Sequence, residues 1–193
     1  QEIHPIPVPQ RKGDPIIVDT DEHPRMKNQG GHWILATDEV DMSALRASFK
    51  QGGTVTAGNS SGINDGAAAV LVMDAESCEK RGLKPKLRWV GSASAGVDPG
   101  IMGYGPVPAT QKLLKRFGLA VEDIALFEIN EAFAAQVIGC QRQLGIDPER
   151  LNVNGGAIAL GHPLGCSGTR ILVTLMNEME RRSKNIKRPF YGV

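Results

Sequence analysis

A histidine in a glycine-rich loop, His162, is the residue of this chain whose surroundings best suit chemistry. The loop runs from Asn154 to Gly168 and holds five glycines, with His162 between Gly161 and Pro163. Glycine lets the backbone approach a ligand closely, and proline fixes the chain after the histidine. An imidazole, with an ordinary pKa near 6.5, suits a general base or an oxyanion donor. A turn histidine without function would have the same neighbours, and the loop lacks the lysine of a phosphate-binding P-loop.

Asn130 is the second candidate. It follows an apolar run, Ala125–Ile129, that we expect to be a strand, and it precedes a helical pattern. In open α/β sheets, ligands bind beyond the carboxyl ends of the strands. A plain N-cap asparagine is the simpler interpretation of the position alone.

Two further loops have unusual composition. Gly53–Gly66 is rich in Gly, Ser, Thr and Asn, and Asn59–Gly62 within it could be a simple turn. Gly96–Pro106 is rich in glycine and contains Met102, a soft, unbranched side chain that packs well against irregular ligands.

Taken together, these four segments resemble the thiolase family, whose members move acyl groups between coenzyme A (CoA) and a catalytic cysteine. The run Asn130-Glu131-Ala132-Phe133 carries much of the likeness. The resemblance implies that Asn130 holds a water completing an oxyanion hole, and that Ala132 and Phe133 line the pantetheine channel. It also implies that His162 activates the nucleophilic cysteine and then donates to the thioester oxygen.

The resemblance implies a CoA site as well. Ala57, Ser61 and Ile63 would belong to it, with the Ser61 hydroxyl reaching a pantetheine amide. Met102 would lie beside the thioester, and Arg25 near the adenine nucleotide. No metal or redox cofactor is implied, since CoA is a substrate.

None of the cysteines matches a catalytic thiol. Cys78 and Cys140 fall on expected helices and indicate buried packing. Cys166 opens a helix, where a thiol can become reactive, but the family has a small packing residue there. His162 and Cys166 alone are too few ligands for zinc. In the family, the nucleophilic cysteine belongs to an N-terminal half absent here, and a second one would follow Val193. We therefore expect the chain alone to be inactive.

The pattern predicts a layered α/β fold in which strands and helices alternate. Prolines make the first 60 residues extended and rich in loops. Apolar runs predict strands at Ile16–Val18, Ala67–Met73, Leu87–Val90, Ala125–Ile129 and Leu151–Val153, and the start of one at Phe190–Val193. Residues 26–40 are expected to form a loop. Helices are expected at Asp41–Lys50, Asp74–Arg81, Val107–Phe117 and Glu131–Leu144, with a final one capped by Ser167.

The resemblance divides the chain into three parts of a partial thiolase-like fold. Residues 1–51 match the end of the family's loop region, 52–85 the last piece of its N-terminal half, and 86–193 most of its C-terminal half without the final strands. The start at Gln1, which is not an initiator Met, indicates a chain that begins within a longer protein.

Composition narrows the class of protein. The 193 residues are 41% apolar and 22% charged, as in an ordinary globular protein, and the net charge of +1 does not indicate a nucleic-acid partner. No apolar run approaches the roughly 20 residues that a membrane span requires, so no membrane partner is expected. The basic run Arg181–Arg188 lies where a helix end would be, and cations favour that position. Three cysteines, without framework spacing, favour a reducing compartment, so we expect a cytoplasmic protein.

The expected function is acyl transfer between acyl-CoA thioesters, either condensing two acetyl-CoA to acetoacetyl-CoA or reversing that reaction by thiolysis. The alternatives are a non-catalytic fragment or a subunit of a split thiolase, a thiolase for longer 3-ketoacyl chains, and a ketoacyl synthase, which would carry a second histidine in place of the Asn130 run. The expected partners are acyl-CoA, CoA, the missing N-terminal half or a complementary segment, and further copies in a dimer or tetramer.

Overall fold

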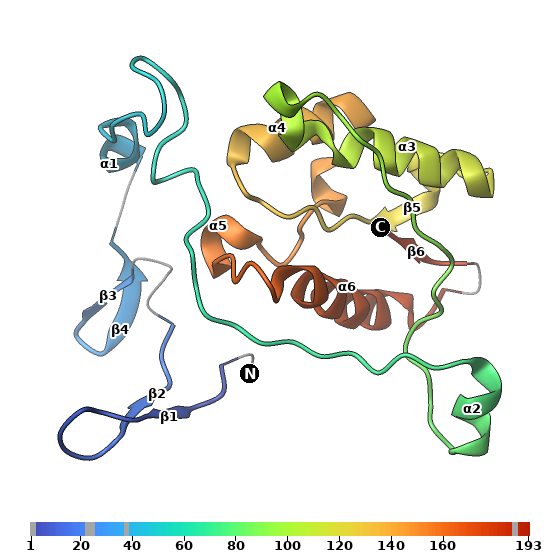
Figure 1. Cartoon of the computed structure of the whole chain (residues 1–193), viewed down its shortest axis with the longest axis horizontal. Coiled ribbons are helices and arrows are strands. Elements are labelled where there is room, and N and C mark those ends of the chain that lie inside the picture. Colours follow the sequence, from blue (N-terminus) through green and yellow to red (C-terminus); the bar gives the residue numbers. More distant parts are fainter. Residues whose placement is uncertain (1–2, 22–25, 37–38, 187–188) are drawn as a thin grey trace. The chain divides into compact units, whose positions relative to one another are not determined.

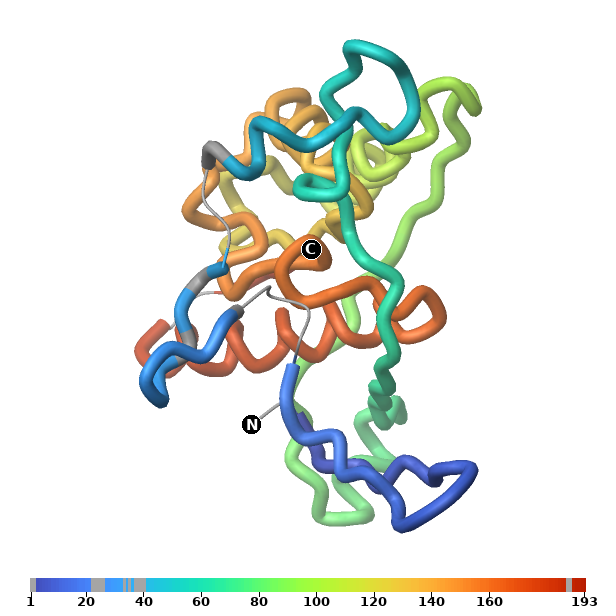
Figure 2. Tube along the Cα trace, turned by 90° about the vertical axis from the view of Figure 1, so that its left-hand side faces the viewer, coloured from blue at the N-terminus to red at the C-terminus, as the bar shows by residue number. Residues whose placement is uncertain are grey.

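The computed structural model describes residues 3–21, 26–36, 39–186 and 189–193. The chain divides into two units, Gln1–Leu45 and Arg46–Val193. Both are drawn in Figure 1 and, from a second direction, in Figure 2.

The first unit begins with a short antiparallel hairpin. β1 (Ile6–Val8) pairs with β2 (Ile16–Val18), which confirms the strand expected at Ile16–Val18. The apolar side chains of both strands face solvent, and Ile16 is 57% exposed. This hairpin therefore buries little apolar surface within its own unit.

A second hairpin and a short helix complete the first unit. β3 (Met26–Gln29) pairs with β4 (His32–Leu35) across Gly30 and Gly31, whose φ values are 62° and 87°. Positive φ at both central residues is what a two-residue hairpin turn of type I′ requires. The loop expected over residues 26–40 is therefore wrong, because the glycine pair closes a hairpin.

The helix expected over Asp41–Lys50 has the wrong bounds. α1 runs from Glu39 to Ser43 only. Beyond it the chain reverses instead: Ala47 forms an antiparallel bridge with Thr56, and Ser48 N donates to Val55 O at 2.8 Å. The expected helix therefore ends at Ser43, and Phe49 lies in the turn that follows.

The second unit is a layered α/β arrangement with a small parallel sheet (Figure 1). Its helices are α3 (Pro106–Phe117) and α4 (Ala134–Leu144) over one face of the sheet, and α6 (Ser167–Ser183) over the other. The core cluster lies between α3, α4 and the sheet and consists of Val107, Leu114, Ile124, Phe127, Cys140, Leu144 and Ile146. The helices expected at Val107–Phe117 and after residue 166 are confirmed.

The sheet is built around β5 (Ile124–Leu126). A strand was expected at Ala125–Ile129, and β5 begins one residue earlier and already ends at Leu126. β6 (Tyr191–Gly192) pairs parallel with it, so the strand expected at the chain's end is confirmed. On the other side of β5, only a bridge from Phe127 to Leu151 forms where a strand over Leu151–Val153 was expected. In the described part of the chain, no strand pairs with the outer side of β6.

Two apolar segments expected to be buried strands, Ala67–Met73 and Leu87–Val90, are extended but unpaired. Leu71 and Val72 are each 80% exposed, and Trp89 is 69% exposed. Both expectations are wrong for the same reason: among the described residues, no strand offers these segments a hydrogen-bonding edge. Figures 1 and 2 show them as coil leading into and out of α2.

Shorter helices fill the remaining connections of the second unit. The brief helix expected before Gly82 is confirmed: α2 (Ala75–Lys80) is capped by the Asp74 carboxylate, which accepts from Ser77 N. The others are α5 (Ala157–Leu160) and the 3₁₀ turns η1 (Pro99–Tyr104), η2 (Val121–Asp123) and η3 (Pro148–Arg150).

Candidate active site

The side chains of Asn130 and His162 meet in the second unit. Asn130 follows the central strand region, and His162 follows α5 in the glycine-rich loop. Asn130 Nδ2 lies 3.4 Å from His162 Nε2. The other amide atom, Asn130 Oδ1, is buried and has no hydrogen-bond partner among the described residues. Buried polar atoms are nearly always paired, so Asn130 Oδ1 is a free acceptor next to the amide nitrogen that faces the imidazole.

The backbone of His162 is fixed by the loop before Ala67. Its amide donates to Gly62 O at 3.0 Å, and Asn64 Oδ1 lies 3.4 Å from the same nitrogen. Gly161 has a φ of 94°, and a Cβ there would lie 2.5 Å from the Asn64 side chain. Both the backbone angle and this close approach require glycine before the histidine.

The second ring nitrogen of His162 contacts α6. His162 Nδ1 lies 2.6 Å from Ser167 Oγ, which in turn lies 3.1 Å from Pro163 O. Ser167 is only 5% exposed. The sequence indicated Ser167 as the N-cap of the last helix, which is wrong: Cys166 occupies the N-cap, and the Ser167 hydroxyl is turned to the histidine instead.

Glu131 joins the two loops that carry Asn130 and His162. Its carboxylate accepts from Asn152 Nδ2 at 2.9 Å and from Ile158 N, in α5, at 3.1 Å. Asn152, itself 9% exposed, also bonds both backbone groups of Ile129. A Cβ at Gly156 would lie 2.1 Å from the Glu131 carboxyl carbon. No role was predicted for Glu131 or Asn152. The contacts between Glu131, Asn152 and Gly156 join residues that are distant in the sequence, so only the fold reveals them.

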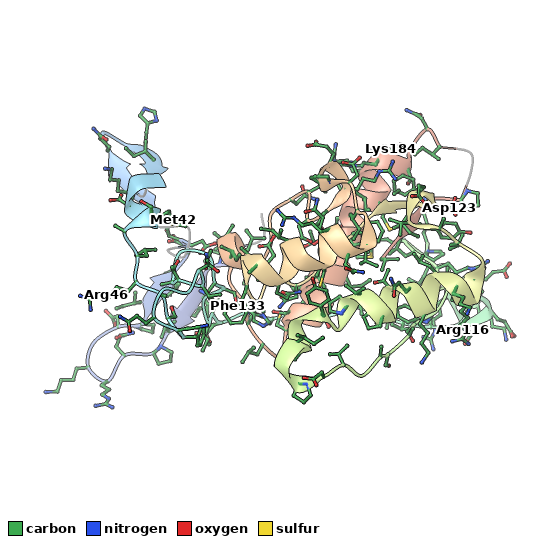
Figure 3. The ribbon with its side chains drawn as sticks, turned by 90° about the horizontal axis from the view of Figure 1, so that it is seen from above. Met42, Arg46, Arg116, Asp123, Phe133 and Lys184 are labelled. Atoms are coloured by element: carbon green, nitrogen blue, oxygen red, sulfur yellow. The ribbon has the colours of Figure 1, made fainter. Side chains whose placement is uncertain are left out.

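Ser61, Ala132 and Phe133, three residues expected to bind CoA, lie together just after Asn130 and Glu131. Ser61 N and Ser61 Oγ both donate to Ala132 O, at 3.1 and 3.2 Å. Phe133 is extended, bridges Ser60 and contacts the Phe49 ring edge-on at 5.8 Å between centroids. The helix expected from Glu131 therefore begins only at Ala134, and Figure 3 shows Phe133 at its start.

The other described residues that were expected to bind CoA have exposed side chains. Ala57 and Ile63 are on the same loop as Ser61 with exposed side chains, Ile63 at 88%. Met102 lies on η1 and is 78% exposed. η1 packs on α4, where Cys140 Sγ donates to the carbonyl of the residue after Met102 at 3.4 Å. Arg25 lies outside the described residues.

In the second unit, Glu128, Glu178 and Cys140 lie on or next to the sheet and its helices and have shifted pKa values. Burial raises the pKa of Glu128 to about 7, opposed by the charge of Arg170. Glu178 lies on α6, and its bonds to Arg181 and Arg182 outweigh burial and lower its pKa to about 2. Burial also raises the pKa of the Cys140 thiol. Cys140 is fully buried and Cys78 is 8% exposed, which confirms that both pack in the interior.

Cys166 faces a shallow pocket next to the His162 loop. The pocket has a volume of about 350 Å³ and is lined by residues 64–68 and 163–166. In the described ranges, no group of three or more His, Cys, Asp or Glu could hold a metal ion. None of the helices that the structure describes is long and apolar enough to cross a membrane.

Family profiles match nearly the whole chain. The profile described as "Thiolase, N-terminal domain" matches residues 1–76, and that of "Thiolase, C-terminal domain" matches residues 83–187. An acetyl-CoA acetyltransferase of Thiocystis violacea is 52% identical over 181 residues, covering 94% of this chain but 44% of its own length. The chain thus spans less than half of the curated relatives it matches.

Solved structures agree in fold. The Bacillus anthracis acetyl-CoA acetyltransferase superposes with a TM-score of 0.83 at 43% identity, covering 93% of this chain and 43% of its own. A human mitochondrial 3-ketoacyl-CoA thiolase, solved in complex with CoA, superposes with a TM-score of 0.74 at 43% identity over 86% of this chain and 40% of its own. The expected partial, mixed α/β architecture with pieces of both thiolase domains is confirmed.

Proposed function

The chain belongs to the thiolase family. We propose that it contributes Asn130 and His162 to an enzyme that transfers acyl groups between CoA thioesters, and that these two residues stabilise the oxyanion. The observation that carries the proposal is the Asn130–His162 pair, with 3.4 Å between the amide and ring nitrogens and a buried, unpaired amide oxygen beside them. A water held at that oxygen would place a second donor next to the imidazole.

In the proposed reaction, His162 takes the proton of a cysteine thiol supplied by the rest of the enzyme. The thiolate attacks the acyl carbon, CoA leaves as the thiol with the proton that His162 took, and the acyl group is now on the cysteine. A base from the rest of the enzyme then takes an α proton from a second acetyl-CoA. The resulting carbanion attacks the acyl group, and the cysteine sulfur leaves and takes up that proton, giving acetoacetyl-CoA and the free cysteine thiol. Hydrogen bonds from His162 and the Asn130-bound water would stabilise the oxyanion, and removing one such donor typically costs about 2.7–4 kcal/mol.

The CoA site remains part of the proposal. Ser61, Ala132 and Phe133 lie beside Asn130, and Ala57 and Ile63 continue the same loop as Ser61. We assign the pantetheine arm to this surface, Met102 to the thioester end and Arg25 to the adenine end. The CoA complex of the human relative supports CoA as the ligand. The relatives named acetyl-CoA acetyltransferases favour a short acyl group over longer 3-ketoacyl chains.

The chain by itself is proposed to be inactive. It matches 44% of its bacterial relative, and the segments at 67–73 and 87–90 have no strand partner among the described residues. We propose 1–51 as loop region, 52–85 as the end of the N-terminal half and 86–193 as C-terminal half. The complementary half is the expected partner, in a cytoplasmic dimer or tetramer. The alternative is that the chain is a non-catalytic fragment, or one subunit of a split enzyme that is inactive until the complementary half is present.

Complementation tests the proposal. The purified chain is mixed with the part of the Thiocystis violacea enzyme that lies outside the matched region, and CoA-dependent cleavage of acetoacetyl-CoA is followed. We expect no turnover from either piece and turnover from the mixture. In the active mixture, His162→Ala lowers kcat by about 10²–10³-fold with little change in KM, whereas His32→Ala, which alters an exposed hairpin residue, changes neither. An increase in KM at unchanged kcat would show that His162 only binds or supports.

A further inference from the structure

The hydroxyl of Ser167 is placed to decide which nitrogen of His162 carries the proton. We infer that Ser167 is a positioning residue that holds His162 as the Nδ1–H tautomer, with the Nε2 lone pair facing Asn130. The inference deepens the proposed function and rests on it for its catalytic consequence, but the tautomer itself can be measured without any reaction.

Counting hydrogen atoms supports this assignment. A backbone carbonyl only accepts, and a serine hydroxyl has a single hydrogen to donate. We assign that hydrogen to Pro163 O, which lies 3.1 Å from Ser167 Oγ and also accepts from the backbone amides of Cys166 and Ser167. The 2.6 Å contact between Ser167 Oγ and His162 Nδ1 then needs a hydrogen on the ring nitrogen. Nε2 is left without a proton and accepts from the Asn130 amide NH₂ at 3.4 Å.

The opposite arrangement satisfies fewer groups. If Ser167 donated to Nδ1, the proton would sit on Nε2, and Asn130 would have to turn its oxygen to the ring. Two amide hydrogens would then occupy the buried position where Oδ1 now has no partner among the described residues. A single acceptor there can be satisfied by one water or one ligand donor, whereas two unpaired donors cost more. Nε2 would also be unable to accept a proton from a thiol.

The support for the ring is rigid. Ser167 is the first residue of the 17-residue helix α6 and is 5% exposed, so its hydroxyl has little freedom. The histidine backbone is held separately, by its amide bond to Gly62 O. Ser167 can keep accepting from Nδ1–H when Nε2 gains a proton, so the same contact would hold the ring as base and as oxyanion donor.

The test is a long-range ¹H–¹⁵N spectrum of the full 193-residue chain labelled at its histidines, recorded near pH 8, about 1.5 units above the ordinary histidine pKa. Only four histidines are present, and a His162→Gln sample assigns the signal. We expect protonated Nδ1 and bare Nε2 in the wild type, the same in Ser167→Thr, and a shift toward Nε2–H in Ser167→Ala. Thr174→Val, which removes another buried hydroxyl of α6, should leave the His162 signals unchanged.

Kinetics of the complemented enzyme give the second readout. Ser167→Ala should lower kcat by about 10- to 100-fold, the range known for outer hydrogen-bond partners of metal-binding histidines, with KM nearly unchanged and activity restored in Ser167→Thr. Nε2–H in the wild type, or an unchanged tautomer in Ser167→Ala, overturns the inference even if acyl transfer is demonstrated. Conversely, the expected tautomer without turnover in the mixture would contradict the proposed function alone.

Discussion

Two kinds of apolar segment in the second unit have nearly the same sequence character and opposite surroundings. β5 carries Ile124 and Leu126, each 1% exposed, between parallel neighbours on both sides. The segment Ala67–Met73 is at least as apolar, yet Leu71 and Val72 are each 80% exposed. The difference shows that an apolar run becomes a buried strand only where a partner strand is within reach.

The site depends on the paired region more than on the unpaired one. Asn130, Glu131 and Asn152 all belong to the segments that follow the central sheet. The loop at 59–64 is held to them by backbone bonds, such as Ala134 N to Asn59 O at 2.9 Å. The unpaired segment begins immediately after that loop. The chemistry of the proposed site can therefore be arranged before the remaining strands are supplied, while its completion depends on them.

The largest expected effect is the difference in unfolding free energy between a substitution in the buried strand β5 and one in the exposed segment Ala67–Met73. Leu126→Ala should lower the free energy of unfolding by about 2–5 kcal/mol, because it opens a cavity beside β5. The matched variant Leu71→Ala should change it by no more than about 0.5 kcal/mol, since that side chain is already in solvent. Urea unfolding of the chain followed by circular dichroism measures both. Equal losses would mean that Leu71 is buried in solution and that the contrast is false.

A smaller effect distinguishes two glycines of the His162 loop. Gly156→Ala places a methyl group 2.1 Å from the Glu131 carboxyl carbon and must displace that carboxylate. Overpacking of this kind typically costs about 1–3 kcal/mol. At Gly165 no atom lies within 4 Å of an added Cβ, so Gly165→Ala should be nearly neutral. The same unfolding experiment compares them, and a neutral Gly156→Ala would show that Glu131 does not join the two loops.

The smallest predicted effect concerns pH. The pKa of Glu128 rises from 4.5 to about 7 on folding, so between these values the folded chain holds a proton that the unfolded chain has lost. Stability should therefore fall as the pH rises through that window, by about 1–2 kcal/mol for a partly buried group. Glu128→Gln should remove this slope. Unfolding curves between about pH 4.5 and 8 test it, and a slope that persists in the variant would assign it to another group.

Glu178, on α6, provides a control because its pKa shifts in the opposite direction to that of Glu128. Its pKa is lowered from 4.5 to about 2 in the folded chain. The stability that it contributes is present above pH 4.5 and is lost as the pH falls toward 2. Glu178→Gln should flatten the acidic branch and narrow the Glu128 window only slightly, because the charge of Glu178 is the last of the causes that raise the pKa of Glu128.

Sequence reasoning predicted the parts whose determinants are local. The helix at Val107–Phe117 follows from proline at its start and a glycine, Gly118, with a φ of 64° at its end. Ile16–Val18 and the strand start at the chain's end were also recovered. The segments 67–73 and 87–90 were predicted as buried strands because composition reports burial but not whether a partner is present.

The site was predicted in its motifs but not in its connections. Asn130 and His162 were chosen separately, and the structure brings them to 3.4 Å. Ser167 was interpreted as a helix cap because Ser at a helix start usually is one, and its bond to His162 depends on the loop's path. Glu131 looked like a helix residue, since its partners Asn152 and Ile158 are distant in sequence.

Hydrogen exchange measured by mass spectrometry tests the central claim most directly: that the exposed apolar segments become strands when the complementary half supplies their partners. In the chain alone, amides of 67–73 and 87–90 should exchange rapidly, while those of 124–128 are protected. Adding the complementary part of the Thiocystis violacea enzyme should protect the first two segments and leave the third unchanged. If a mixture that turns over acetoacetyl-CoA leaves 67–73 and 87–90 exchanging as fast as before, the account is contradicted.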